Sequence, residues 1–193
     1  MDDETHTSKL SVHIHETLSE LGWEFKTKEE RDTPKRFAKY LQYFHHETDY
    51  ANLLQAQFEI PKGDSDVHGI VTQGPIPFRA VCAHHLLPMI GTAHVAYIPG
   101  QKVVGLSKLA RLVRCVGRER PSKQEVIGER ITDLLMRHLH PLGAMTIIRA
   151  EHCCMAARGL DMPGIHTTTA NIRGAFRDNQ TARDEAYRLI NIS

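Results

Sequence analysis

The chain has 193 residues, of which 41% are hydrophobic and 24% are charged, and its formal net charge is +1. This composition suits a globular unit with its own core. The small charge argues against a surface for duplex nucleic acid or a polybasic membrane anchor, and no apolar run approaches the roughly 18 residues of a membrane span. Because the start, MDDETHTSKL, is polar and acidic, we expect neither a signal nor a transit peptide, and therefore a cytoplasmic protein.

An N-terminal helical segment is predicted over residues 1–50, ahead of one structural unit over residues 51–193. Leucine and isoleucine recur at helical spacing between residues 10 and 21 and predict a helix to about residue 22. Thr33 and Pro34 are typical of the start of a second helix, with Thr33 as its N-cap and Pro34 at its first position.

Short β-rich runs begin at about residue 66. Glycine and proline separate them, as expected of an antiparallel sheet. The runs span residues 66–73, 76–82, 91–98 and 102–106, and two later ones span about 144–152 and 167–176. With a last helix at about 181–190, this order predicts an α+β fold in which helices cover one face of an antiparallel sheet.

Two further helices are predicted between the two groups of strands. Ser107 would be the N-cap of the first, and Pro121 introduces the second. Ser122 and Glu125 match a capping box, which would give Glu125 a purely structural role.

The sequence contains two pairs of basic residues, and the two members of each pair are one helical turn apart. Arg36 and Lys39 share a face of the helix that follows Pro34. Lys108 and Arg111 fall near the start of their helix, where exposed N–H groups favour an anion. A solvated charged face is the alternative explanation for both pairs.

Two short segments about 70 residues apart carry metal-binding residue types. Cys82 and His85 are close enough in sequence to reach one ion, and Cys154 would join them from a distant strand. Two thiolates and one imidazole leave the fourth position of a Zn²⁺ for water, which is the arrangement of a catalytic zinc site. His84 and His152 would stand beside the metal and move protons. The pattern therefore favours an enzyme that adds water to an electrophilic carbon.

The remaining cysteines leave alternatives open. Cys153 could replace Cys154 as the ligand, because adjacent residues on a strand point to opposite faces. Cys115 is expected to be a buried thiol without chemistry. In a chain with 13 histidines, buried cysteines and surface histidines that bind no metal are the alternative to the whole site. Without an export signal, thiol or metal roles are expected rather than disulfides.

Several motifs in one order resemble the GTP cyclohydrolase I family. They are Thr33-Pro-Lys-Arg-Phe-Ala-Lys39, Cys82-Ala-His-His-Leu-Leu-Pro, Gly91-Thr-Ala-His-Val-Ala-Tyr-Ile-Pro99, Gly105-Leu-Ser-Lys-Leu-Ala-Arg111, His152-Cys-Cys-Met-Ala-Ala-Arg-Gly159 and Thr167-Thr-Thr. The resemblance covers nearly the whole chain from about residue 30, and a set of ordered motifs is far more specific than any single one.

The resemblance implies a fold, an assembly and a reaction. The family has the tunnelling fold and forms a toroidal homodecamer with active sites between subunits. Its zinc enzymes convert GTP and water to 7,8-dihydroneopterin triphosphate and formate. Water adds to C8 of guanine, the imidazole ring opens and loses formate, and the ribose rearranges before a new ring closes. The product serves pterin biosynthesis, where tetrahydrofolate and one-carbon metabolism, biopterin and 7-deazaguanine routes all stay open.

The resemblance also implies the roles of individual residues. The zinc ligands of the family map onto Cys82, His85 and Cys154, and its catalytic histidines map onto His84 and His152. Its triphosphate contacts map onto Arg36, Lys39, Ser107, Lys108, Arg111 and Arg158, and its guanine-reading pair maps onto Gln124 and Glu125. Because a tetra-anionic tail needs several converging cations, the resemblance favours binding over a solvated face for both basic pairs.

Three departures from the family pattern concern the region around the base. Ala83 stands where the family has glutamate, Val126 stands where it has arginine, and one extra residue lies between Ser107 and Glu125. Two alternatives to the cyclohydrolase therefore remain. One is a related purine-nucleotide hydrolase with altered base specificity, and the other is a catalytically idle homologue that binds nucleotides.

Overall fold

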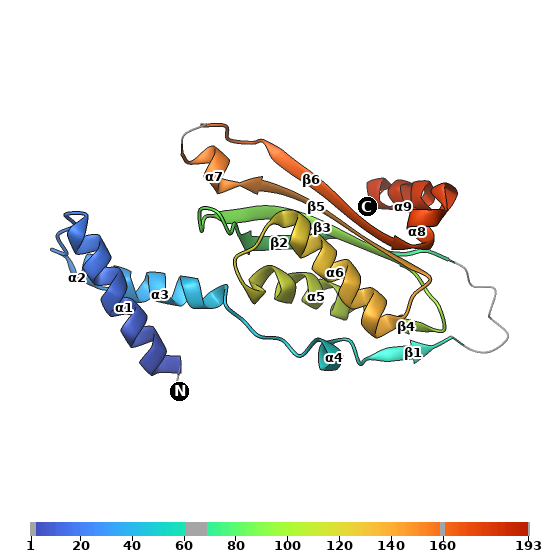
Figure 1. The fold of residues 1–193 in the computed structure, drawn as a ribbon, viewed down its shortest axis with the longest axis horizontal. Helices are drawn as coiled ribbons and strands as arrows, with labels where there is room; N and C mark the ends of the chain where they lie inside the picture. Colours follow the sequence, from blue (N-terminus) through green and yellow to red (C-terminus); the bar gives the residue numbers. More distant parts are fainter. Residues whose placement is uncertain (1–2, 61–68, 159–160, 193) are drawn as a thin grey trace. The chain divides into compact units, whose positions relative to one another are not determined.

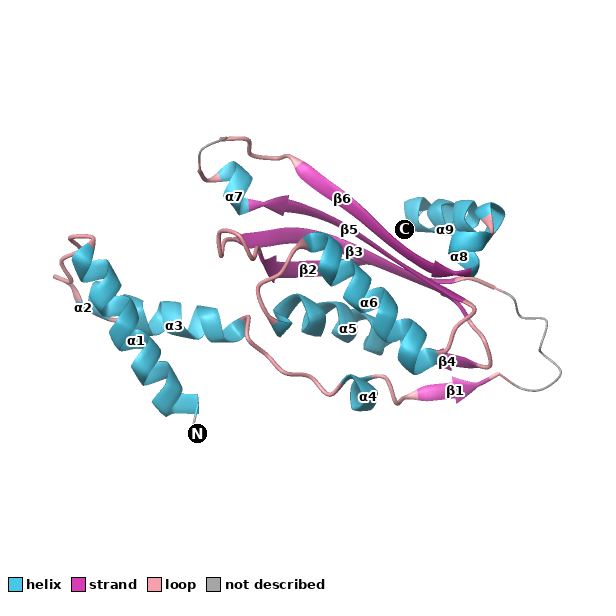
Figure 2. Ribbon diagram, in the orientation of Figure 1, coloured by secondary structure: helices cyan, strands magenta, loops and turns pink. Residues whose placement is uncertain are grey.

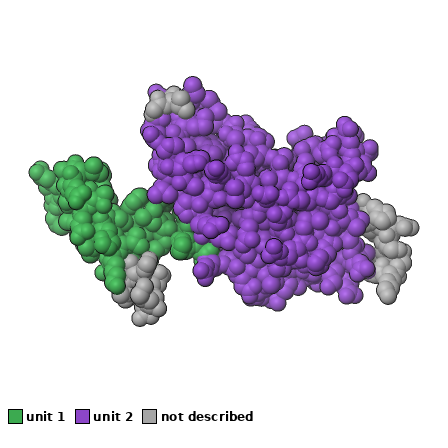
Figure 3. Space-filling model, viewed as in Figure 1, with its two compact units in different colours: residues 1–46 green, residues 47–193 purple. Residues whose placement is uncertain are grey.

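The computed structural model describes residues 3–60, 69–158 and 161–192, and the chain divides into two compact units (Figure 3). The first unit is Met1–His46 and the second is Glu47–Ser193. Among the described residues, no helix is both long and apolar enough to cross a membrane.

The first unit consists of three helices, α1 (Asp3–Glu20), α2 (Lys28–Arg31) and α3 (Thr33–Tyr43). The helix predicted to about residue 22 is confirmed as α1. It ends where Gly22 adopts a positive φ of 84° and donates its amide to the carbonyl of Ser19 at 2.9 Å. Asp32 ends α2 and is also the N-cap of α3, so the predicted N-cap, Thr33, is wrong by one residue.

A four-stranded antiparallel sheet in the order β2-β3-β5-β6 organises the second unit (Figures 1 and 2). Its strands are β2 (Val71–Val81), β3 (Pro88–Ile98), β5 (Gly143–His152) and β6 (His166–Gly174). A short helix, α4 (Tyr50–Leu53), precedes a smaller pair of strands, β1 (Gln57–Glu59) and β4 (Lys102–Val104).

The runs predicted at 66–73 and 76–82 belong to one strand, β2. Its pairing with β3 shifts between Gln73 and Ile76, where a glycine and a proline interrupt the ladder. Because these two residue types usually mark the end of a strand, the sequence predicted two strands here. Residues 66–68 of the first predicted run lie outside the described part of the chain.

Helices α5 (Leu106–Glu119) and α6 (Gln124–Leu139) pack on one face of the sheet, as predicted. Val95 and Tyr97 of β3 are buried in the same apolar cluster as Leu112 of α5. The same cluster contains Ile127 and Ile131 of α6, so one core holds both helices against the strands.

The opposite face of the sheet is also covered, at one end, by α8 (Ala175–Asp178) and α9 (Gln180–Ile192). Ala96 and Ile98 of β3 are buried there against Phe176 and Ile190. The prediction of helices on one face is therefore wrong for the C-terminal helix. The reason is the strand period of two, because successive residues of 95–98 face opposite sides and all four are buried.

Helix α6 begins without the predicted capping box. Its N-cap is Lys123, which makes no side-chain capping hydrogen bond. Ser122 is used in another way, because it forms a backbone bridge with Cys82 and its carbonyl accepts from the amide of Ala83 at 3.0 Å. Glu125 is therefore an exposed residue in the first turn of α6, and it does not take part in a capping box.

Gly91 of β3 lies so close to the backbone of β5 that substituting it tests the packing of these two strands. A Cβ atom on Gly91 would collide with the carbonyl oxygen of Arg149 and lie 2.6 Å from the Cα of Ala150. We expect Gly91→Ala to lower the free energy of unfolding by about 1–3 kcal/mol, as overpacking does. Gly69→Ala is the matched control, since a Cβ there meets nothing within 4 Å. Urea denaturation would contradict this account if both variants unfolded at the same midpoint.

Candidate functional site

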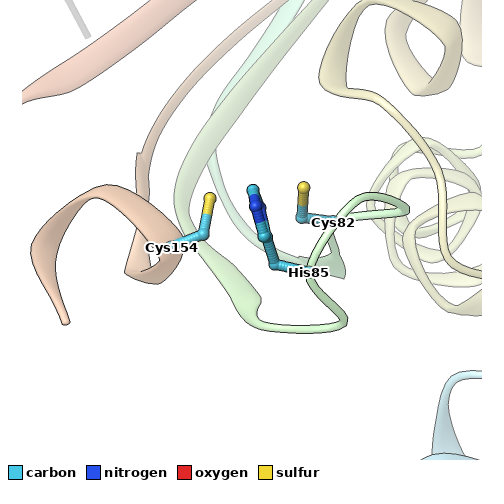
Figure 4. Close-up of side chains that lie close together, drawn as sticks. All are labelled: Cys82, His85 and Cys154. Carbon is cyan, nitrogen blue, oxygen red and sulfur yellow. The ribbon is translucent and has the colours of Figure 1, made fainter. Parts of the chain in front are cut away.

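Three potential metal ligands come together at one end of the sheet. The Sγ atoms of Cys82 and Cys154 and a ring nitrogen of His85 all lie within 4.8 Å of one another. Cys82 is buried, Cys154 is partly exposed and His85 is exposed. Figure 4 shows the three side chains side by side, with Cys82 and His85 coming from one turn and Cys154 from a separate helical segment.

The turn between β2 and β3 positions the first two residues of this cluster. The carbonyl of Cys82 accepts from the amide of Leu86, and the amide of Cys82 donates to the carbonyl of Leu87, both at 2.9 Å. Leu86 has a positive φ of 55°, which helps to reverse the chain. Cys82 and His85 are therefore held in one closed turn.

The pairing of β3 with β5 brings in the third residue. Met89 lies opposite His152 in this register, so the end of β5 is beside the start of β3. The chain then enters α7 (Cys153–Ala156), which places Cys154 on a short helix rather than on the strand that we predicted. The thiol that joins the cluster is that of Cys154 and not that of Cys153.

The two thiols influence each other. Burial raises the pKa of Cys154, and the neighbouring Cys82 raises it further, whereas Arg158 opposes the effect. Ionising both thiols would place two negative charges together, and a bound cation would compensate them. The donor set is thus suited to a soft or borderline divalent metal.

Both predicted proton-transfer histidines lie at this end of the sheet. The Nδ1 atom of His84 is 3.9 Å from the Sγ atom of Cys82. The Nε2 atom of His152 is 2.9 Å from the Oε1 atom of Gln124. Burial lowers the pKa of His152, and the charge of Glu125 acts in the opposite direction. His152 is therefore a partly buried imidazole with a defined partner on one nitrogen.

Gln124 and Glu125 differ sharply in environment although they are neighbours in sequence. Gln124 is only 1% exposed, and its amide group bonds to the sheet and to His152. Glu125, in contrast, is exposed. The family resemblance implies that both residues contact guanine, but their different burial indicates that they have different roles.

The predicted triphosphate contacts of α5 lie at the other end of the sheet. The hydroxyl of Tyr97 accepts from the amide of Val104 at 3.3 Å, so β4 and the start of α5 lie beside the end of β3 (Figure 1). From Met89 to Tyr97 the strand extends about 26 Å. The residues at the start of α5 are Ser107, Lys108 and Arg111. Since Gly105 is the N-cap of α5, the predicted N-cap, Ser107, is wrong.

The other predicted triphosphate contacts have different positions. Arg158 is exposed in the loop after α7, close to Cys154. Arg36 and Lys39 are exposed on α3 of the first unit, where Arg36 pairs with Asp32 at 3.6 Å. Within the second unit, Arg158 is thus the predicted phosphate ligand at the end of the sheet that carries Cys154. The other three, Ser107, Lys108 and Arg111, lie at the opposite end.

Comparison with known proteins gives the context of this site. The family model described as GTP cyclohydrolase I matches residues 10–191. A protein of Geobacillus sp. (strain WCH70), named GTP cyclohydrolase 1, is 45% identical over 166 residues, which cover 82% of this chain and 83% of the relative. The protein of the same name from Hydrogenobaculum sp. (strain Y04AAS1) is 36% identical over 182 residues, with 94% and 96% coverage.

Two further matches are shorter. A GTP cyclohydrolase 1 of Pelotomaculum thermopropionicum is 51% identical over 116 residues, which cover 60% of this chain and 61% of the relative. A solved structure, the archaeosine synthase QueF-Like in its apo form, covers 55% of this chain and 92% of its own with 13% identity. Its TM-score of 0.43 is too low to support an argument about the fold.

Proposed function

The chain belongs to the GTP cyclohydrolase I family, and on this premise we propose that it uses a Zn²⁺ at Cys82, His85 and Cys154. Membership makes it a hydrolase of pterin biosynthesis with GTP as its substrate. The proposed reaction consumes GTP and water and yields 7,8-dihydroneopterin triphosphate and formate, by opening the guanine imidazole ring at C8, rearranging the ribose and closing a new ring.

The observation that carries the proposal is the convergence of two thiols and one imidazole from distant parts of the chain. Ligands bind one zinc ion at about 2.0–2.3 Å each, so ligand atoms within 4.8 Å of one another fit a shared ion after small side-chain rotations. A zinc ion with an open position supplies a Lewis acid that lowers the pKa of the water it holds. The exposed side of His85 leaves room for substrate.

Two imidazoles at the cluster would move the protons of the reaction. Opening the imidazole ring requires a proton on the departing nitrogen, and ring closure requires protons to be removed again. His84 lies beside Cys82, and His152 stands two residues before Cys154. An imidazole can accept and donate protons at neutral pH, so we assign proton transfer to this pair.

Glu125 is the proposed contact of the guanine base. Its carboxylate is exposed at the start of α6, and no capping hydrogen bond competes for it. A carboxylate can accept from both the N1–H and the 2-amino group of guanine, a pair of donors that adenine lacks. This residue would therefore select GTP over ATP.

We also propose that the complete site forms between copies of the chain. Ser107, Lys108 and Arg111 lie at the end of the sheet remote from Cys82, too far for one triphosphate to reach from the cluster of the same copy. A neighbouring copy that presents its α5 would supply the missing cations, with Arg158 from the copy that carries the cluster. A tunnelling fold assembled as a homodecamer would provide this arrangement. Arg36 and Lys39 of the first unit stay proposed triphosphate contacts on the family resemblance alone.

Turnover of GTP tests the function. Zinc-loaded protein should release formate from GTP and yield a product that becomes fluorescent neopterin after oxidation and dephosphorylation. GTP should be consumed much faster than ATP, because Glu125 pairs with the donors of guanine. Equal rates would favour a purine-nucleotide hydrolase with altered specificity, and no formate from any nucleotide would favour an idle homologue.

Removal of one thiol tests the metal site. Cys154→Ser should lower zinc content and GTP turnover together, because it removes one of three protein ligands. Cys153→Ser is the matched control and should keep its zinc, measured by elemental analysis after dialysis. If the two variants exchanged these results, Cys153 would be the ligand.

Mixing two inactive variants tests the shared site. Lys108→Ala/Arg111→Ala removes cations from one end of the chain, and His152→Ala removes a proton carrier from the other. Coexpressed chains that mix at random should regain about a quarter of wild-type turnover, since one site in four would combine two intact halves. No recovery in isolated mixed oligomers would place both halves of the site in one chain.

A further inference from the structure

The side chain of Gln124 makes hydrogen bonds to two strands of the sheet and to His152. Its Nε2 donates to the carbonyls of Ile148 and Thr167 at 3.0 Å and also lies 3.1 Å from the hydroxyl of Thr169. Its Oε1 faces the Nε2 of His152 at 2.9 Å. The side chain of one helical residue thereby joins two neighbouring strands to the histidine.

These contacts fix which way the amide points. Backbone carbonyls can only accept, so the NH₂ group of Gln124 must face Ile148 and Thr167. The reversed amide would place its oxygen against both carbonyl oxygens, and a residue that is only 1% exposed cannot turn this group toward solvent instead. The atom that faces His152 is therefore the oxygen.

An amide oxygen has no hydrogen to donate. The Nε2 atom of His152 must then carry the hydrogen of this contact, which leaves Nδ1 with the lone pair in the neutral ring. The same bond limits rotation of the imidazole. A free glutamine that contacts guanine would need its amide at the surface, and this one is buried.

We infer that Gln124 is a positioning residue for His152 rather than a reader of guanine, and that it selects the ring tautomer in which Nδ1 exchanges protons with the substrate. This inference rests on the proposed role of His152 in proton transfer. The two neighbouring residues then have different roles. The exposed Glu125 would contact the guanine base, and the buried Gln124 would orient His152.

Steady-state kinetics of Gln124→Met in the zinc-loaded protein provide the first test. Methionine keeps the length of the side chain and removes every hydrogen bond. We expect kcat to fall about 10–100-fold, as for other residues that orient an active-site histidine, with KM for GTP within about twofold of wild type. A raised KM with unchanged kcat would instead identify Gln124 as a substrate contact and overturn the inference.

Thr132→Val is the matched control for structural damage. Thr132 is also a buried residue of α6, and its hydroxyl bonds to Thr146 of β5 at 2.9 Å without touching His152. This variant should be destabilised and yet retain wild-type kcat. If it lost as much kcat as Gln124→Met, the effect would come from packing between α6 and the sheet.

A spectroscopic measurement keeps the inference falsifiable even if Gln124→Met fails to fold. In zinc-loaded wild-type protein labelled with ¹⁵N-histidine, the ring shifts of each histidine report which nitrogen carries hydrogen, and His152→Gln identifies the signal of residue 152. The inference requires hydrogen on Nε2 of the neutral ring, and a hydrogen on Nδ1 would refute it. This readout does not depend on turnover, so absent formate release by wild type would refute the proposed function separately.

Discussion

The register of β3 against β5 is the constraint on which the site depends. Ten residue pairs, from Met89 with His152 to Ile98 with Gly143, align the two strands. This alignment puts the end of β5 beside the turn that holds Cys82 and His85, although the two segments are about 70 residues apart. Slipping the pairing by one residue would send each side chain of β5 to the other face of the sheet. Burial on both faces of β3 makes such a slip costly, so packing of the core maintains the geometry of the cluster.

A second constraint ties α6 to the same end of the sheet. The backbone bridge between Ser122 and Cys82 joins the loop before α6 to the turn that holds Cys82 and His85. This bridge places Gln124 within reach of β5 and His152. The proposed metal ligands, proton carriers and base contact therefore all lie on elements that these backbone contacts join.

Sequence reasoning identified the main helices and strands because their apolar patterns are long and regular. It was wrong where a local signal competed with the surrounding structure. Thr33 and Ser107 have good N-cap chemistry, but Asp32 and Gly105 precede them at the turns where the helices begin. The covering of the second face by α9 was missed, although the unbroken apolar run at 95–98 is typical of a strand buried on both sides.

The candidate site was partly accessible to the same reasoning. Residue types and spacing suffice to nominate Cys82, His85 and Cys154, but the choice of Cys154 over Cys153 depends on the helical turn after β5. No periodicity could reveal that Gln124 is buried beneath His152, because that contact joins a helix to the end of a strand through the tertiary fold. The separation of Ser107 from the cluster likewise follows only from the three-dimensional path of α5.

The central claim is that one zinc ion is held by two thiolates and one imidazole brought together by this register. X-ray absorption at the zinc edge of the metal-loaded protein tests it most directly. The account predicts two sulfur scatterers at about 2.3 Å and two nitrogen or oxygen scatterers at about 2.0–2.1 Å. A first shell with one sulfur or none would contradict the account.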